Sequence, residues 1–474
     1  MQVGNMRRKT TVEHDVFGVA RFSSEYKTVK QRREEGKSLR GKIPRELHAE
    51  CGGNFNRPDP VKFIKNANEG RIENLIPIRY GRMAASAFAF YRGTASLMAM
   101  DLAHTPTTNI RVQACGDCHL SNFGLFATPE RNIIFDVNDF DETLPAPFEW
   151  DIKRLSASFY IACLDKGFSD KDCKAIARCC VRAYRKAIAQ FSTMNVLDVW
   201  YTKLDADFLL ASAPDAATKQ DVERIIEGAK ENAAKSVFPK ITEAQNGRKR
   251  IVDQPPLVYH PLPDENVHED ILSAFRTYRK TLASERQVLL DRYRIEDIVH
   301  KVVGVGSVGT WCGVVLLVAE INDTLLLQIK EARGSVLEPY AGKSKFAHHG
   351  ERVVAGQRLM QSASDILLGW TTGNDMYNKQ FYIRQLRDMK FSFDISTMTP
   401  KQVSHYAETC GWTLALTHAR SGDASTIYGY IGKSDIFDKA IGSFAGTYAK
   451  QTMKDYEVFL DAIKSGEITA EKEE

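Results

Sequence analysis

The sequence predicts an α+β protein, in which a helix-rich body carrying a few short strands is joined to a smaller unit of antiparallel strands. Three observations lead to this prediction. Apolar residues recur three and four positions apart over much of the chain, which is the spacing of amphipathic helices. Two short apolar runs flanked by turn residues interrupt this pattern between residues 109 and 137. β-Branched residues punctuated by glycine concentrate between residues 296 and 394, as in a meander of strands.

In the first half of the chain, good helix formers predict helix over 79–104 and again over 150–250. Between these stretches, the runs RVQACGD and RNIIFDV read as two strands with a loop between them. The later segment DQPPLVYHPLPDEN contains four prolines and cannot be helical throughout, so it marks a connection.

In the second half, a helical stretch ending near Tyr293 precedes the strand-rich segment IVHKVVGVGSVGTWCGVVLLVAEINDTLLLQIKEA. A helix is expected over 350–370, a strand in FYIRQLRD, and helices to the C-terminus. We therefore divide the chain into four regions: a basic N-terminal arm with helices, a helix-rich region, a β-rich region and a C-terminal helical region, over 1–70, 71–295, 296–394 and 395–474.

The composition is that of an ordinary globular protein, with 43% hydrophobic and 26% charged residues. A formal charge of +4 is small for 474 residues and argues against a nucleic-acid binder. No run approaches the roughly 20 apolar residues of a membrane span, and the N-terminus lacks the apolar core of a secretory signal. The nine cysteines fit reduced thiols, so we expect a cytoplasmic protein with no membrane partner.

One motif carries most of the chemical signal. The segment CGDCHLSNFG places Asp117 and Asn122 five residues apart after a predicted strand, and the next apolar run ends at Asp136. Phosphoryl transfer requires a carboxylate that orients the attacking hydroxyl, together with an amide and a carboxylate that hold Mg²⁺ on the phosphates. Asp, Asn and Gly are also ordinary turn residues, which is the alternative interpretation.

GDCHLSN resembles the catalytic loop of the aminoglycoside phosphotransferases and related small-molecule kinases, whose pattern is H-G-D-x-H-x-x-N. The resemblance implies a catalytic role for Asp117 and a metal-binding role for Asn122. Asp136 would be the second metal ligand, the counterpart of the Asp in the D-F-G motif of protein kinases, with Asp139 as a spare carboxylate. The segment EWDIKRL also resembles the family, and implies that Asp151 braces the catalytic loop by hydrogen bonds.

The match departs from the family at Cys115, where the family has His. With Cys118 and His119, this residue also forms the Cys-x-x-Cys-His signature of c-type haem attachment. Haem attachment of that kind needs export, and a redox Cys-x-x-Cys is expected beside a βαβ unit. Neither context is visible, so haem and redox functions are the least favoured alternatives.

A second motif lies in the β-rich region, where Gly304, Gly306, Ser307 and Gly309 precede a strand and Lys330 lies on the next one. A Rossmann loop would instead open a helix and be followed by an acidic residue about 20 positions later. Strand, glycine loop, strand and strand-borne lysine resemble the ATP-binding lobe of kinases, which implies that the glycines and Lys330 bind the phosphates. A plain glycine-rich hairpin is the alternative.

The kinase resemblance also implies a helical glutamate that pairs with Lys330. The helix that follows offers Glu351 only at its start, with Gln357 and Gln361 further along, so this partner stays open. The glycine loop follows the catalytic loop by nearly two hundred residues, the reverse of the kinase order. We therefore expect a two-lobed, protein-kinase-like fold that is circularly permuted, with a helix-rich catalytic lobe and a small antiparallel ATP-binding lobe.

Nearly the whole chain also resembles an uncharacterised bacterial family classed as a domain of unknown function. The segments that carry this resemblance are RYGRMAASAFAFYRG, GDCHLSNFG, FDVNDFDE, VGVGSVGT, LQIKEA, VVAGQRLMQSASDILLGW, FYIRQLRDMK and LALTHARSGD. The family brings no substrate with it. Arg79, Arg82 and Arg92 in the first segment are candidates for binding phosphate or an acidic substrate, although surface or ion-pair roles are slightly preferred.

The motifs together predict a phosphotransferase that uses ATP and Mg²⁺. Its acceptor would be a hydroxyl or amine of a small molecule, ahead of a protein. Two alternatives remain: nucleotidyl transfer on the same fold, and a nucleotide-binding regulator without catalysis.

Overall fold

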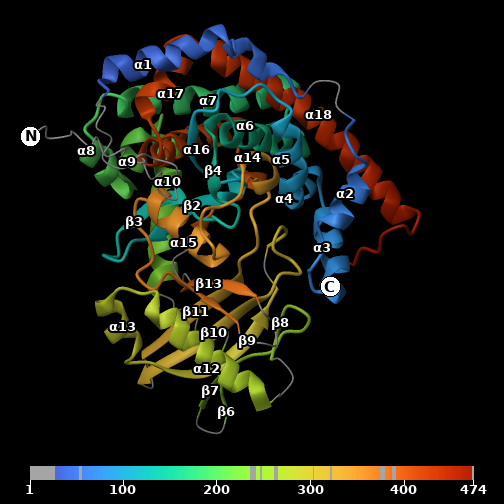
Figure 1. Ribbon diagram of the computed structural model, residues 1–474, viewed down its shortest axis with the longest axis vertical. Coiled ribbons are helices and arrows are strands. Elements are labelled where there is room, and N and C mark those ends of the chain that lie inside the picture. Colours follow the sequence, from blue (N-terminus) through green and yellow to red (C-terminus); the bar gives the residue numbers. More distant parts are fainter. Residues whose placement is uncertain are drawn as a thin grey trace, which may run out of the picture.

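The protein, described here from a computed structural model, consists of a helical body and a six-stranded sheet beside it (Figure 1). The structure describes residues 27–52, 56–234, 242–245, 248–260, 265–302, 304–320, 323–373, 379–386 and 391–471. Within these residues, none of the helices combines the length and the apolar character needed to cross a lipid bilayer.

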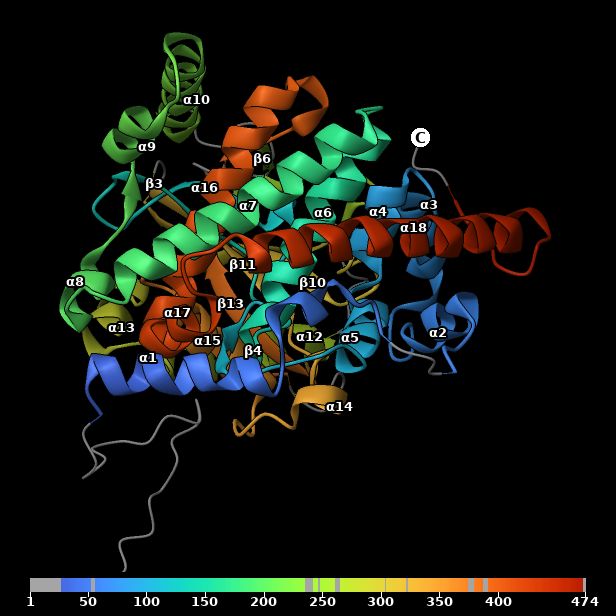
Figure 2. The same cartoon turned by 90° about the horizontal axis from the view of Figure 1, so that it is seen from above.

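The body is built around a central, almost wholly buried helix, α6 (Phe148–Asp165). Helices α7 (Asp170–Phe191), α16 (Pro400–Ser421) and α18 (Ile436–Lys464) pack around it, so segments from both halves of the chain share one core (Figure 2). The remaining helices of the body are α1 (Val29–Ser38), α2 (Pro60–Asn66), α8 (Val196–Tyr201), α9 (Ala206–Ser212), α10 (Ala216–Ala234) and α17 (Ala424–Ile431).

The expected helix over 79–104 is three shorter helices, α3 (Ile76–Met83), α4 (Ala87–Gly93) and α5 (Ala95–Ala103). Its interruption has a local cause, because the Ser86 side chain accepts a hydrogen bond from the Ala89 amide (3.1 Å) and caps a new helix. Helix over 150–250 is largely confirmed, but the end of that stretch forms a hairpin of β6 (Thr242–Gln245) and β7 (Arg248–Ile251).

Two small sheets carry the loops of the body. Strand β1 (Arg111–Ala114) pairs with β4 (Leu144–Pro147), whereas β2 (Phe123–Ala127) and β3 (Ile133–Val137) pair with each other. Strands β5 (Leu204–Asp205) and β14 (Phe391–Ser392) flank the second pair. The two strands predicted here, β1 and β3, therefore exist but belong to different sheets. The loop over 115–122 joins these sheets.

The larger sheet is antiparallel, in the order β12-β13-β11-β10-β9-β8. These strands are Gly369–Thr372, Gln380–Gln385, Asp323–Glu331, Cys312–Glu320, Arg294–Lys301 and Val258–Tyr259. Helices α12 (Glu265–Lys280) and α13 (Ser284–Leu290) cover one face, where Leu327 and Ile329 of β11 are buried. Because side chains alternate along a strand, Gln328 and Lys330 point to the other face, toward the body.

Helices α14 (Glu338–Ala341) and α15 (His349–Met360) lie between β11 and β12 in the chain. The helix predicted over 350–370 therefore ends at Met360, and its last residues form β12 instead. α15 packs against β12 and β13 and links the sheet to the body through Arg352. This buried guanidinium donates hydrogen bonds to the carbonyl oxygens of Thr143 (2.5 Å) and Asp141 (2.8 Å).

Candidate functional site

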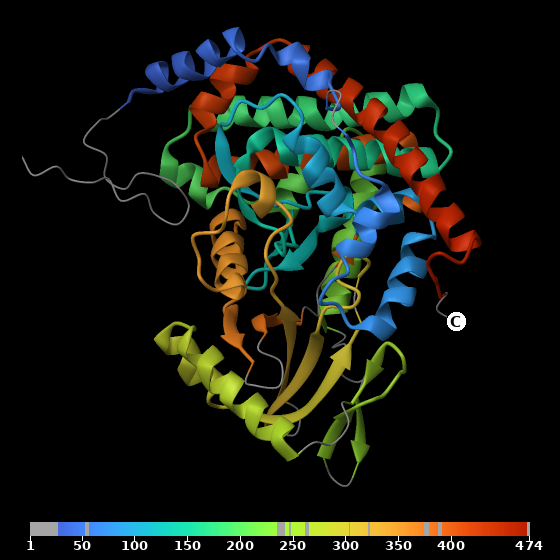
Figure 3. The same ribbon diagram turned by 45° about the vertical axis from the view of Figure 1, so that its right-hand side comes forward.

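A cavity of about 420 Å³ lies where the body, the β9–β10 loop and the N-terminal helices meet. Figure 3 shows these helices, α2 and α3 in blue, beside the sheet. Residues from both predicted motifs line this one cavity, namely Asp117, Asn122, Asp139, Gly304, Gly306 and Ser307. The fold thus brings together two segments that are far apart in the sequence.

The loop over 115–122, called the catalytic loop here after the motif that it resembles, is held in place by α6. The Asp151 carboxylate accepts hydrogen bonds from the amides of Cys115 (2.6 Å) and Gly116 (3.1 Å), which confirms the predicted brace. His418 Nε2 lies 3.3 Å from the same carboxylate, and its other ring nitrogen contacts the Tyr184 hydroxyl (2.8 Å). Gly116 has a positive φ of 80°, and a Cβ there would lie 2.3 Å from the backbone oxygen of Glu142. Only glycine fits this turn.

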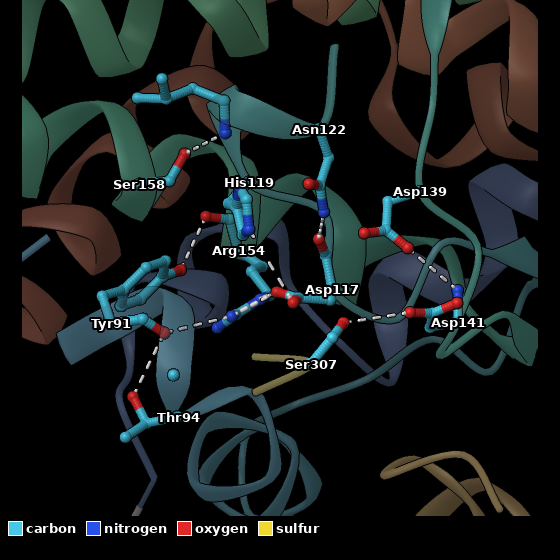
Figure 4. Close-up of polar contacts among 12 residues, drawn as sticks. Tyr91, Thr94, Asp117, His119, Asn122, Asp139, Asp141, Arg154, Ser158 and Ser307 are labelled. Carbon is cyan, nitrogen blue, oxygen red and sulfur yellow. Dashed lines mark hydrogen bonds and ion pairs between the residues drawn. The ribbon is translucent and has the colours of Figure 1, made fainter. Parts of the chain in front are cut away.

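Asp117 projects from this loop toward the cavity, with 23% of its side chain exposed. Its Oδ1 accepts hydrogen bonds from Nε (2.7 Å) and Nη2 of the buried Arg154, whose guanidinium lies over the Tyr91 ring (4.4 Å). Its Oδ2 makes no hydrogen bond within the described part of the chain; His119 Nε2 lies 3.8 Å away. Burial lowers the pKa of His119 well below its usual value, so this ring is neutral. One carboxylate oxygen is thus fixed and the other is available (Figure 4).

Asn122 and Asp139 offer oxygen ligands next to Asp117. The Asn122 amide group donates to the Asp117 backbone oxygen (2.7 Å), and its own Oδ1, which accepts no hydrogen bond from the described residues, can bind a cation. Asp139 forms no ion pair with any described residue, and its Oδ1 accepts one hydrogen bond, from the Asp141 amide (3.2 Å). Burial and then the Asp141 charge raise the pKa of Asp139. A buried carboxylate that forms no ion pair with the described residues, although the charges of Lys330 and Arg384 act on it, fits a hard cation such as Mg²⁺ when it lies beside an amide oxygen.

Asp136, the carboxylate predicted as the second metal ligand, is not brought to the cavity. It is buried behind it, where the Ser362 amide (2.8 Å) and hydroxyl (2.6 Å) donate to its Oδ2 and the Val137 amide to its Oδ1 (2.8 Å). Both oxygens are therefore used to join two segments of the body. These contacts argue against the predicted metal-ligand role of Asp136, whereas Asp139, which was also predicted at the metal site, lines the cavity.

Lys330 is buried on the sheet and does not itself line the cavity, but it pairs with the lining residue Asp141, the Nζ–Oδ2 distance being 2.5 Å. The Tyr382 hydroxyl donates to the other oxygen of this carboxylate (2.6 Å), and Ser307 Oγ lies 3.5 Å from Oδ2. No candidate on α15 takes this role. Of these, Gln361 donates to the Val137 backbone oxygen, Gln357 donates to Gln361, and Glu351, which is itself described, forms no hydrogen bond or ion pair with the lysine.

The glycine loop, between β9 and β10, is held in place by Arg71 and Ile72 of the N-terminal segment. Arg71 Nη1 donates to the Val308 backbone oxygen (2.6 Å), and the Ile72 amide donates to that of Gly309 (2.7 Å). Gly304 and Gly309 both have positive φ, of 69° and 85°, which explains the glycines at these positions. Gly309 itself does not line the cavity.

Several cavity residues were missed by the sequence motifs, namely Arg71, Asp141, Glu142 and Arg333. One signal was available, because Asp139-Phe140 are the first two residues of a D-F-G-like motif, which points to Asp139 and its neighbourhood rather than to Asp136. Glu142 also faces the cavity, and burial raises its pKa to about 7. Arg71 and Arg333 carried no local pattern.

The cysteine alternative can be examined at the same loop. Among the described residues, one group of three or more His, Cys, Asp or Glu side chains has its ligand atoms close enough together to hold a metal ion. This group is Cys115, Cys118 and Asp151. All nine cysteines are free thiols, and burial raises the pKa of Cys118 to about 12. A protonated thiol is a poor ligand, and the Asp151 oxygens already accept two amide hydrogen bonds. This cluster is therefore better explained as the packed underside of the catalytic loop.

Comparison with known proteins gives one positive result. The family described as "Uncharacterized protein conserved in bacteria (DUF2252)" matches residues 71–462. Neither the curated proteins nor the solved structures contain a match to this chain. The matched range includes the catalytic loop, the glycine loop and Lys330, and it covers the cavity lining except Asn66, Ala67 and Glu69. This chain belongs to that uncharacterised bacterial family.

Proposed function

We propose that this protein is a phosphotransferase of the kinase-like type that uses ATP and Mg²⁺. One observation carries the proposal: Asp117, Asn122 and Asp139 of the body share a cavity with the glycine loop of the sheet. Phosphoryl transfer is catalysed mainly by positioning and charge, and these are the groups that such catalysis needs.

The order of the strands supports a permuted, kinase-like arrangement. Strands β9 and β10 flank the glycine loop, β11 carries Lys330, and α15 comes before the last two strands. In space the order is β9-β10-β11-β13-β12, so the lysine strand is central. In kinases, too, the lysine lies on the third strand of the ATP-binding lobe, which follows the glycine-rich loop in the sequence. Strand β14 then pairs with β2, next to the catalytic loop, which links the end of the sheet back to the body.

Each side chain has a role that its contacts suit. Asp117, fixed through Oδ1 by Arg154, would accept the proton of the attacking hydroxyl on Oδ2. Asn122 and Asp139 would hold the metal, and when bound Mg²⁺ supplies charge neutralisation on the phosphates. Lys330 and the amides of the glycine loop would bind the phosphate oxygens. The acceptor oxygen forms a bond to the γ-phosphorus while the bond between the γ-phosphorus and the β–γ bridging oxygen breaks. The electron pair of the broken bond leaves with ADP.

A test starts from purified protein with Mg-ATP, followed for both ADP and pyrophosphate. Asp117→Asn is the informative variant, because Asn retains an oxygen that can accept from Arg154. Asp207→Asn is the matched control, since Asp207 is exposed on α9, away from the cavity lining. We expect ADP release from the wild type and the control, and a loss of about 10³-fold or more in the variant.

The products separate the alternatives. Pyrophosphate in place of ADP would identify nucleotidyl transfer, which the same metal site could support. Magnesium-dependent ATP binding without either product, across a panel of hydroxyl and amine acceptors, would favour a regulator. If thermal shift detects no binding of Mg-ATP to the folded wild-type protein, the kinase-like proposal is wrong.

A further inference from the structure

The cavity holds more cationic groups than an ATP-phosphate site requires. Four arginines line it, namely Arg71, Arg79, Arg92 and Arg333, in addition to Lys330, which is not a lining residue but pairs with the lining residue Asp141. Arg79 is used structurally, since its Nη1 donates to Asn68 (3.0 Å) and its Nη2 to the Gly93 backbone oxygen (2.6 Å). The other three retain donors that face the cavity.

Arg71 and Arg333 form a like-charged pair on the wall opposite the catalytic loop. Arg333 Nη2 donates to the Glu69 backbone oxygen, and Arg71 Nη1 donates to that of Val308. Arg71 Nη2 and Arg333 Nη1 have no hydrogen-bond partner among the described residues. Burial and then the charge of Arg333 lower the pKa of Arg71 to about 10. Two partly desolvated guanidinium groups that repel each other are stabilised when an anion binds both.

The acidic groups near this pair act on it at a distance. Glu331 Oε1 lies 3.9 Å from Arg333 Nε, while its Oε2 is held by Lys379 (2.8 Å) and the Trp311 amide (2.9 Å). Glu142 accepts the Val336 amide rather than an arginine (2.7 Å). No carboxylate among the described residues is hydrogen-bonded to either Arg71 or Arg333.

Arg92, on α4, lies nearer the reacting groups. It forms no hydrogen bond or ion pair with any residue that the structure describes, and its Nε is buried. Asp117 and Asp139 are the charges that act on it, opposing the effect of burial on its pKa. A guanidinium with free donors beside a catalytic carboxylate is suited to neutralising a phosphoryl group in transfer.

We propose that the acceptor of this enzyme is a small anion, whose phosphate or carboxylate group binds Arg71 and Arg333 while its hydroxyl reaches Asp117. The proposal rests on the phosphotransferase function proposed above. Arg92 contacts the transferred phosphoryl group, and Lys330 with the glycine loop binds the rest of the nucleotide. The hydroxyl proton passes to Asp117 and then to solvent.

The test uses inorganic phosphate and malonate as separate probes for the two kinds of anionic group. Each is titrated calorimetrically into the full-length protein, with and without saturating Mg²⁺ and a non-hydrolysable ATP analogue. Arg333→Gln is the principal variant, because Arg71 also supports the glycine loop. Arg286→Gln is the matched control, since Arg286 lies on α13, which covers the other face of the sheet.

We expect the nucleotide-loaded wild type and control to bind at least one probe. Arg333→Gln should weaken that binding about 10-fold or more, because it loses a charge-assisted hydrogen bond to the anion. Preference for one probe identifies the anionic group. No binding to the loaded wild type, or equal binding to Arg333→Gln, overturns the acceptor class. Displacement of the bound anion by the nucleotide analogue also overturns the acceptor class, because Arg71 and Arg333 would then bind the phosphates of the nucleotide itself. A protein that binds no nucleotide overturns the phosphotransferase function itself, which is read independently in the same titrations.

Discussion

The two walls of the cavity are held in place by different kinds of contact. On the body wall, Asp151 accepts hydrogen bonds from two amides of the catalytic loop, and Tyr406 donates to the Leu120 backbone oxygen (2.6 Å). These partners are buried in the largest core of the molecule. On the sheet wall, Lys330 is positioned by the carboxylate of Asp141, which belongs to the body. The glycine loop is likewise held by residues of the N-terminal segment.

This difference predicts different responses to mutation. The body wall is pre-organised by buried hydrogen bonds, so changes there alter the stability of the fold together with its function. The geometry of the sheet wall depends on a few contacts made across the cavity, so changes there alter function at a smaller cost in stability. Four experiments can break or sharpen this distinction.

The largest effect is expected on the sheet wall, for Lys330→Met. If Lys330 binds the phosphates as proposed, its removal should lower kcat/KM for ATP by about 10³-fold, or roughly 4 kcal/mol. Asp141→Asn keeps this lysine and should have a smaller effect, through loss of its position. Steady-state ADP release measures both. Equal losses in the two variants would mean that the ion pair, rather than the lysine, carries the function.

The next effect concerns the brace of the body wall. Asp151→Ala leaves the amides of Cys115 and Gly116 and the ring of His418 without their acceptor, in a fully buried place. Two orphaned amide donors alone predict a loss of about 2–4 kcal/mol in the free energy of unfolding. Urea unfolding measures this loss, with Asp207→Asn as the surface control. A change below about 0.5 kcal/mol would contradict the pre-organised wall.

The third experiment contrasts two carboxylates of the same segment, Asp136 and Asp139. Asp136→Asn should destabilise by about 1–3 kcal/mol, because the new amide group would face a donor on Ser362 or Val137, while magnesium affinity stays unchanged. Asp139→Asn should abolish the magnesium-dependent part of nucleotide binding without lowering stability, because it removes an unpaired, desolvated carboxylate. Urea unfolding and magnesium titration of nucleotide binding measure the two responses. The opposite pattern would restore Asp136 as the ligand.

Sequence patterns predicted the parts of this molecule that depend on local signals. The alternation and the glycines of the β-rich region predicted β9, β10, β11 and the loop between the first two, and the kinase-like motif located Asp117, Asn122 and their brace. Strands β4 and β5 were not predicted. β4 has four residues, two of them prolines, and β5 has only two residues, so neither shows a hydrophobic periodicity.

The rest of the site depends on contacts between distant segments. Lys330 and Asp141 are 189 residues apart, and Arg71 and Val308 are 237 apart. No spacing in the chain could indicate these pairs. The family resemblance implied a helical glutamate for Lys330, whereas α15 supplies Arg352 instead, which fixes the backbone of the loop that carries Asp141. The candidate site residues were therefore more predictable than the contacts that position them.

The smallest effect is expected at Glu142, where the two walls meet. Burial raises the pKa of this carboxyl to about 7, above its usual value of 4.5, so the folded state retains a proton that the unfolded state releases. Stability attributable to this group is therefore present at low pH and is lost as pH rises from about 4.5 to about 7. Glu142→Gln removes the ionisation while retaining an acceptor for the Val336 amide. It should stabilise the protein by about 3 kcal/mol at pH 8 and by much less at pH 5.

Urea unfolding at the two pH values tests this, with the exposed Glu457→Gln on α18 as a control that should change neither. A gain of equal size at pH 5 and pH 8 would mean that the variant acts by packing and not by charge. The same ionisation adds a negative charge near Arg71, one of the groups that acts on this arginine. The affinity for anions at Arg71 and Arg333 should therefore fall above pH 7 in the wild type and stay constant in Glu142→Gln. This result would show that one carboxyl group couples the stability of the body wall to anion affinity at the two arginines.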